Sequence, residues 1–422
     1  MATKQNANLA KYDLTQRMAP YFDPHFMFPI LKWLREKGIY SQTDIRAAEF
    51  ALANNPEVSR MSDFAVVTHE AFVDALKASN SDVEVAAPNV DKEQLQAEFA
   101  QRMDAGKGAW AVIGNAEKVA ELKKENAFNY EGLLKNGATP AEVESIFDLA
   151  RFYHSCGLYK QALEMVVLYR KVGAQDGSFR YFGTMWAQLA ECICMLLNPD
   201  TPSTKRPLSS VGGAEPSDYA LRVLRDTIEK RTTLEGVKEV EQRRWMLHWS
   251  LFVLFSRPKP QDELFDLFFS MREARSEQRT RKNDYLAIAQ TVSPWLLRYV
   301  SYAAVINFKN IGKRLKQFVN VLKVEEESYS GPMTRLFTAL FDKCDIDAAL
   351  DAVREAADVI RADYFLGSMA AAVRGSVGTV IKEFQQAALQ IGMYLTWLLL
   401  FDIGCGVCFC CCSSSCPSRE AT

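Results

Sequence analysis

The sequence is poor in the residues that interrupt helices. Its 422 residues include only 21 glycines and 15 prolines, and between them the apolar residues recur at helical rather than strand spacing. We therefore predict an all-α fold. At this length, two or more structural units or one extended repeat are expected.

The sequence also lacks a large net charge and a secretory signal. Lysine and arginine number 50 against 52 aspartates and glutamates, so no overall field draws the chain to nucleic acid or to an acidic membrane. The first residues, MATKQNANLAKYDLTQR, lack the apolar core of a signal peptide, and the four cysteines before the C-terminal tail show no disulfide framework. We expect a reduced, cytoplasmic environment.

Motifs for catalysis, metal binding and cofactor binding are absent as well. The four histidines, His25, His69, His154 and His248, are scattered, and no HExxH motif or paired Cys/His spacing joins them into a zinc site. No GxxxxGKS, GxxxxGKT, GxGxxG or GxSxG motif is present. We expect structural histidines, no catalytic residue, no metal site and no cofactor, and we predict that the chain is not an enzyme.

The clearest helical pattern is a predicted helical hairpin over residues 139 to 173. Thr139 and Glu142 form a capping box, and an apolar stripe follows until Gly157 ends the first helix. A second stripe begins at GLYKQAL and ends near Gly173. This rhythm of glycine, aromatic and small residues is typical of tetratricopeptide-type helical pairs.

A related pattern over residues 336 to 360 favours a repeat architecture. Asp345 can cap a helix there, and apolar residues keep the helical period from Ile346 to Ile360. Two such units at distant places favour an α-solenoid of the tetratricopeptide or HEAT-like kind.

Two segments interrupt the helical pattern. Residues 198 to 217 are rich in Pro, Ser and Gly and predict a flexible loop. The second segment, residues 271 to 284, carries charges of both signs, which predicts a solvated loop or helix end. Its local positive charge also permits contact with RNA. We name its five cations the basic cluster: Arg272, Arg275, Arg279, Arg281 and Lys282.

The most apolar segment before the tail is RRWMLHWSLFVLFSRPK, residues 243 to 259. It is far shorter than the ~20 residues that span a bilayer, so we predict a buried core helix. Trp245, Trp249, Phe252 and Phe255 are available for packing, and His248 should hydrogen-bond a neighbour. An aromatic cofactor box is the alternative interpretation.

Several separated stretches resemble the e-type subunit of eukaryotic translation initiation factor three, a member of the PCI-domain family. YDLTQRMAPYFDPHFMFPILKWL is similar to the opening of that family, and ARFYHSCGLYKQALE to a second block. RRWMLHWSLFVLFSRPK matches a Trp-x-x-His-Trp-Ser-Leu-Phe-Val signature, and PWLLRYVSYAAVINFKN and EEESYSGPMTRLF resemble later blocks. The resemblance runs from residue 11 to about residue 390. It implies a helical-repeat arc leading into a PCI domain that ends in a winged helix.

The resemblance implies four segments and a scaffold role. The segments are an N-terminal helical domain (11–138), helical repeats (139–230), a PCI region (231–400) and a divergent cysteine-rich tail (401–422). The implied function is that of a non-catalytic subunit that supports assembly of the factor and recruitment of mRNA to the small ribosomal subunit. Its partners would be the other subunits, the small ribosomal subunit and, through local basic patches, mRNA or rRNA. The alternatives are a PCI scaffold of another complex, such as the signalosome or a proteasome-lid-like assembly, and a nonproductive truncated isoform.

The tail departs from the family pattern. Where the winged helix should continue, the chain reads QIGMYLTWLLLFDIGCGVCFCCCSSSCPSREAT, so the winged helix is expected to be incomplete, without its recognition helix and wing. Six cysteines crowd here, but three are consecutive and no histidine is near, which disfavours a zinc site. A lipid or membrane anchor is the stronger alternative, although Asp402 and several glycines argue against it. We predict poor order over residues 402 to 422.

Overall fold

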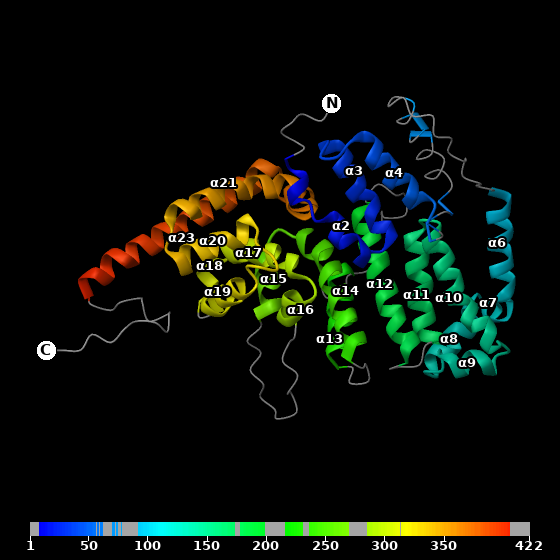
Figure 1. Cartoon of the computed structure of the whole chain (residues 1–422). Helices are drawn as coiled ribbons and strands as arrows, with labels where there is room; N and C mark the ends of the chain where they lie inside the picture. The colour runs from blue at the N-terminus through cyan, green and yellow to red at the C-terminus, as the bar shows by residue number, and fades with distance from the viewer. Residues whose placement is uncertain are drawn as a thin grey trace. The chain divides into compact units, whose positions relative to one another are not determined.

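The computed structural model describes residues 8–55, 57–58, 60–61, 70–71, 73–74, 77, 92–173, 178–198, 216–230, 236–269, 285–312 and 314–405. Within these ranges every regular element is helical, which confirms the predicted all-α fold (Figure 1). The chain divides into two compact units, Met1–Val253 and Leu254–Thr422. The four segments expected from the sequence stay a prediction.

The N-terminal unit begins with short helical turns and continues as a series of longer helices. The turns are η1 (Ala10–Tyr12), α2 (Thr15–Met18), η2 (Ala19–Tyr21) and η3 (Pro24–Phe26). The helices are α3 (Met27–Lys37), α4 (Gln42–Ala53), α6 (Lys92–Ala105), α7 (Lys107–Ile113), α8 (Ala116–Lys124), α9 (Tyr130–Lys135), α10 (Pro140–Ser155), α11 (Tyr159–Val172), α12 (Phe179–Leu197), α13 (Pro216–Lys230) and α14 (Gly236–Phe255).

Helices α10 and α11 form the predicted hairpin. The hydroxyl of Thr139 accepts a hydrogen bond from the backbone N–H of Glu142, and the Glu142 carboxylate accepts one from the backbone of Thr139, which completes the capping box. Gly157 takes φ +74°, a left-handed conformation that suits glycine and ends the first helix. The pairwise packing continues in chain order from α10 to α13, as in a helical-repeat stack (Figure 1).

Helix α14 contains the predicted core segment. Trp249 is 7% exposed, and its indole N–H donates to the backbone carbonyl of Tyr21 at 2.8 Å. His248 is fully buried and its Nδ1 hydrogen-bonds the carbonyl of Arg244 at 2.7 Å, so the predicted hydrogen bond to a neighbour is confirmed. Trp245 departs from the expectation: it is 43% exposed and packs edge-on against Trp186, because it lies on the outer side of the helix.

The C-terminal unit is a cluster of shorter helices with one long last helix. Its elements are α15 (Pro260–Phe269), α16 (Tyr285–Thr291), η6 (Pro294–Leu296), α17 (Leu297–Ile306), α18 (Phe308–Ile311), α19 (Arg314–Val324), α20 (Pro332–Thr338), η7 (Ala339–Lys343), α21 (Ile346–Ala362), η8 (Phe365–Met369), α22 (Ala370–Arg374) and α23 (Val377–Cys405). As predicted, Asp345 caps α21, accepting from the N–H of Ala348 at 2.9 Å. Phe265, Phe269, Phe318 and Phe337 pack together in the core of this unit.

A buried ion pair crosses this core. Arg298 on α17 donates from Nη1 to Asp363 Oδ2 at 2.9 Å, and both side chains are at most 5% exposed. The hydroxyl of Tyr299 donates to the same Oδ2 at 2.9 Å, while Oδ1 accepts from the backbone N–H groups of Phe365 and Leu366. Asp363 therefore satisfies donors from two helical segments at once.

One prediction about an irregular segment needs correction at its end. The expected loop 198–217 is too long, because α13 already begins at Pro216 with Ser217 buried. Helix α23 extends to Cys405, and the poor order expected over residues 402–422 stays a prediction. The basic cluster and residues 406–422 lie outside the described residues.

Candidate functional site: a groove and the histidine cluster in the N-terminal unit

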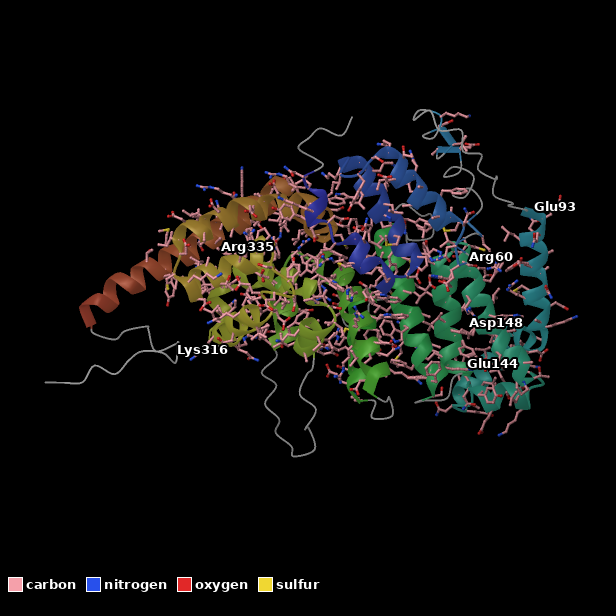
Figure 2. The ribbon with its side chains drawn as sticks, in the orientation of Figure 1. Arg60, Glu93, Glu144, Asp148, Lys316 and Arg335 are labelled. Atoms are coloured by element: carbon pink, nitrogen blue, oxygen red, sulfur yellow. The ribbon has the colours of Figure 1, made fainter. Side chains whose placement is uncertain are left out.

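A groove of about 860 Å³ lies in the N-terminal unit. It is lined mainly by side chains of α6, α10 and α12, including Asp148 of α10, and also by Arg60, which precedes α6; Figure 2 labels both residues. Asp23, His154 and Glu191 also line it. These three side chains and the adjacent His25 form what we name the histidine cluster: Asp23, His25, His154 and Glu191.

Asp23 and His25 are positioned by the turn at η3. Asp23 precedes Pro24 and caps the turn, because its Oδ1 accepts from the backbone N–H of His25 at 2.9 Å. The same oxygen lies 3.0 Å from His25 Nδ1. A carboxylate can only accept, so Nδ1 of His25 donates and, in the neutral ring, Nε2 keeps its lone pair.

His154 and Glu191 come from neighbouring helices of the repeat stack. His154 lies near the end of α10, where its Nδ1 hydrogen-bonds Glu191 Oε1 of α12 at 2.8 Å. Its Nε2 lies 3.5 Å from Asp23 Oδ2, so the imidazole sits between two carboxylates. The His25 and His154 rings meet edge to face with centroids 4.1 Å apart.

The electrostatics of the cluster follow from burial and pairing. Burial opposes the charge on His154, but its hydrogen bonds to Asp23 and Glu191 prevail and raise its pKa to about 10. Burial also opposes ionisation of Asp23, yet the two histidines hold its pKa well below the usual range. Burial raises the pKa of Glu191 and lowers the pKa of His25. His154 is thus an imidazolium and His25 a neutral imidazole at pH 7.

Arginines and aromatics line another part of the groove. Arg60 and Arg102 both pair with the carboxylate of Glu98, at 3.2 and 3.3 Å. The guanidinium of Arg102 also lies 4.6 Å from the ring centre of Phe152, within the range of a cation–π contact. This part of the groove presents positive charge that is already partly neutralised.

The thiols near the cluster are not poised for catalysis. Burial raises the pKa of Cys192 to about 12 and the pKa of Cys194 well above its usual range, so both stay protonated thiols at pH 7. A nucleophile must be the thiolate. The cluster therefore supplies imidazole nitrogens and carboxylate oxygens, which suit charge pairing or metal binding.

His25 and His154 are far apart in the sequence but lie side by side in the structure. The expectation that the histidines are scattered is wrong for this pair: their rings meet because the turn at η3 packs against α12 and the end of α10. Their structural role stays a prediction. His69 lies outside the described residues. One local signal was present: Glu191 is the one acidic residue of the apolar helix α12. A lone carboxylate in such a helix indicates a buried partner.

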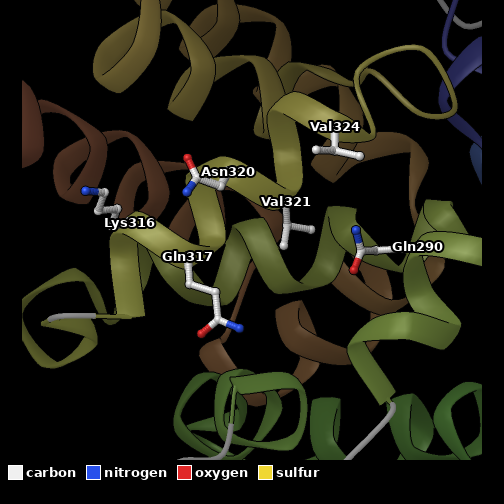
Figure 3. A pocket seen from close by; sticks show the side chains of 6 residues that line it. All are labelled: Gln290, Lys316, Gln317, Asn320, Val321 and Val324. Atoms are coloured by element: carbon white, nitrogen blue, oxygen red, sulfur yellow. The ribbon is translucent and has the colours of Figure 1, made fainter. Parts of the chain in front are cut away.

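A second hollow, of about 480 Å³, lies in the C-terminal unit (Figure 3). Gln290 of α16 and residues of α19 line it: Lys316, Gln317, Asn320, Val321 and Val324. Its lining offers amides, one lysine and apolar surface, without a histidine, cysteine or carboxylate.

The comparisons with known proteins agree with this architecture. Residues 13–153 match the family described as eIF3 subunit 6 N terminal domain. The matched stretch includes η3 with His25 and ends one residue before His154. The class is therefore an all-α helical-repeat protein whose residues 13–153 are similar to the N-terminal domain of an initiation factor subunit.

The individual relatives are more specific. The E subunit of eukaryotic translation initiation factor 3 from Yarrowia lipolytica is 27% identical over 381 residues, covering 88% of this chain and 80% of the relative. The proteins of the same name from Schizosaccharomyces pombe and Arabidopsis thaliana are 25% and 26% identical, covering 85% and 86% of this chain and 67% and 73% of the relatives. The resemblance to this type of subunit is confirmed.

Among the residues with described placement, no helix combines the length and apolar character that crossing a bilayer requires.

Proposed function

We propose that the chain is a non-catalytic scaffold subunit of eukaryotic translation initiation factor 3. The observation that carries this proposal is the continuous likeness to the E subunits of that factor over 85–88% of the chain, which includes both compact units. The helical-repeat stack supports it, because such stacks present long faces to partners. In this role the chain works in the cytoplasm and holds other subunits in place.

The finer part of the proposal concerns the ribosome. A scaffold of this kind supports assembly of the factor on the small ribosomal subunit and the recruitment of mRNA to it. The basic cluster is the candidate for direct contact with rRNA or mRNA, because it concentrates positive charge on a chain whose formal net charge is −2. Contacts through other subunits would leave the basic cluster without this role.

Co-purification from cytosolic extract tests the proposal. The full chain with an N-terminal tag should recover several subunits of initiation factor 3, identified by mass spectrometry, and should co-sediment with the small ribosomal subunit. A tagged helical-repeat protein of similar length and unrelated family is the control. Recovery of signalosome or proteasome-lid subunits instead would favour a different PCI scaffold. A folded chain that elutes alone would favour a nonproductive isoform.

A further inference from the structure

Three side chains of the histidine cluster are close enough to share one ion. One ligand atom from each of Asp23, His25 and His154 lies within 4.8 Å of the other two. Two ligands of a tetrahedral zinc ion, each about 2.1 Å from the metal, lie about 3.4 Å apart. Small side-chain movements are therefore enough to place the three ligands around one ion.

Two buried atoms of the cluster have no other partner. Nε2 of His25 and Oε2 of Glu191 make no hydrogen bond in the described structure, although the two side chains are 0% and 3% exposed. Buried polar atoms are paired in the great majority of cases, so the hydrogen bonding of the ion-free cluster is incomplete. The His25 nitrogen that faces Asp23 is Nδ1, 3.0 Å from Oδ1, so a bound ion takes the place of the Nδ1 proton and the ring keeps its proton on Nε2.

Glu191 provides the outer contact that metal-binding histidines commonly have. Its Oε1 is 2.8 Å from Nδ1 of His154, which leaves Nε2 on the side of Asp23, 3.5 Å from Oδ2. In zinc sites the second ring nitrogen of a ligand histidine usually donates to a carboxylate, which fixes the orientation of the ring. The arrangement of Glu191, His154 and Asp23 has this order, and an ion bound at Nε2 of His154 replaces the proton that this nitrogen carries in the ion-free protein and releases it to solvent.

The groove gives an ion a route to the cluster. Asp23, His154 and Glu191 all line it, and Asp23 and His154 are 16% and 18% exposed. A water molecule from the groove could complete four ligands. Two imidazoles with a carboxylate suit zinc and similar divalent transition metals, whereas calcium prefers only oxygen ligands.

From these observations we infer that Asp23, His25 and His154 bind a divalent transition-metal ion, with Zn²⁺ as the natural occupant and Glu191 as the residue that positions His154. The ion joins the N-terminal turn at η3 to α10, and through Glu191 to α12. Its role is structural: it fastens the start of the chain to the repeat stack. This inference is independent of the proposed scaffold function.

Zinc titration of the purified full chain tests the site. The tail cysteines could bind zinc on their own, so the reference protein carries serine in place of Cys405, Cys408, Cys410, Cys411, Cys412 and Cys416. After chelation and dialysis, this protein should bind one Zn²⁺ per chain in calorimetry and metal analysis, and its melting temperature should rise with Zn²⁺. Co²⁺ in the same site should show ligand-field bands without a thiolate charge-transfer band.

Variants locate the ion. His154→Gln and Asp23→Asn should each abolish the bound zinc and the zinc-dependent rise in melting temperature. Asn keeps the capping ability of Asp23, so the second variant is expected to stay folded if the first does not. Glu191→Gln should weaken affinity by about 10- to 100-fold, as for other outer-shell carboxylates. His248→Gln is the matched control, a buried histidine outside the cluster, and should bind zinc normally.

Three results would overturn the inference. They are the absence of bound zinc in the reference protein, a thiolate band in its cobalt spectrum, and zinc binding that survives unchanged in both His154→Gln and Asp23→Asn.

Discussion

Removing the carboxylate of Asp363 should strongly destabilise the C-terminal unit. Asp363→Ala leaves the guanidinium of Arg298 buried without its counter-ion and removes the acceptor of the Tyr299 hydroxyl and of two backbone N–H groups. Breaking a buried ion pair by deleting one partner typically costs about 3 to 5 kcal/mol, and the lost capping bonds favour the upper part of this range. The cost arises from the charge left behind rather than from the pair itself.

A second variant separates the cost of the unpaired Arg298 charge from the loss of the ion pair itself. Replacing both partners, as Arg298→Met with Asp363→Ala, removes the stranded charge and should recover a large part of the loss. The exposed pair of Arg335 and Glu355 is the matched control, because its N and O atoms lie 2.5 Å apart while its side chains are 44% and 42% exposed. Glu355→Ala should cost no more than about 1 kcal/mol, because exposed ion pairs are weak.

Urea unfolding of the full chain, followed by circular dichroism, measures these differences. If the two units unfold in separate steps, only the step of the C-terminal unit should move. The reasoning is refuted if Asp363→Ala costs as little as Glu355→Ala, or if the double variant is less stable than Asp363→Ala alone.

Three further predictions concern other parts of the chain. Trp249→Ala should lower the free energy of unfolding by about 3 to 5 kcal/mol, as for other emptied aromatic sites, whereas Trp245→Ala at the exposed position should cost much less. If the Trp249→Ala variant melts normally but no longer binds its partners, α14 is an interface instead. The pKa of His248 is lowered from 6.5 to about 4, mainly by burial. The hydrogen bond to the Arg244 carbonyl raises this pKa, and the positive charge of Arg244 lowers it further. The neutral side chain then stabilises the fold fully above pH 6.5, and this contribution fades as the pH falls toward 4. In urea melts, the His248→Gln variant should therefore lose less stability than the unchanged protein between pH 6.5 and 4, with a difference of up to about 3 kcal/mol. An equal dependence of stability on pH in the two proteins would contradict the assignment. Reversing three charges of the basic cluster should reduce the salt dependence of ribosome association by about one unit of log–log slope per lost phosphate contact; an unchanged slope in filter binding would exclude RNA contact.

Local features of this fold are predictable from the sequence. The capping box of Thr139 and Glu142 and the cap at Asp345 involve residues three positions apart, so their side chains meet in any chain that forms a helix there. The apolar stripe alone also placed Trp249 in the core. Trp245 was misjudged because a helix that is apolar all round gives no sign of which side faces outward.

The histidine cluster was beyond such reasoning. His25 and His154 meet only because the N-terminal turn packs against the repeat stack, a contact that no periodicity encodes. His154 and Glu191 are 37 positions apart, on helices that are not consecutive. The solitary acid in α12 could indicate burial, but its partner required the fold.

The capping box has a consequence for the order of folding events. Besides capping α10, Glu142 Oε1 accepts from the backbone N–H of Gly108 at 2.8 Å, at the start of α7 and 34 positions earlier in the chain. The bond to Thr139 can form as soon as the hairpin of α10 and α11 begins to grow, whereas the bond to Gly108 requires a long loop to close. One carboxylate thus serves an early local contact and a late distant one. Thr139→Ala removes the hydroxyl from the first contact, and Gly108→Ala disturbs the second because its Cβ would lie 2.5 Å from the Glu142 carboxylate oxygens. A kinetic analysis of the two variants should find a high φ-value for the first contact and a low one for the second, so the surroundings of Glu142 would report when α7 docks.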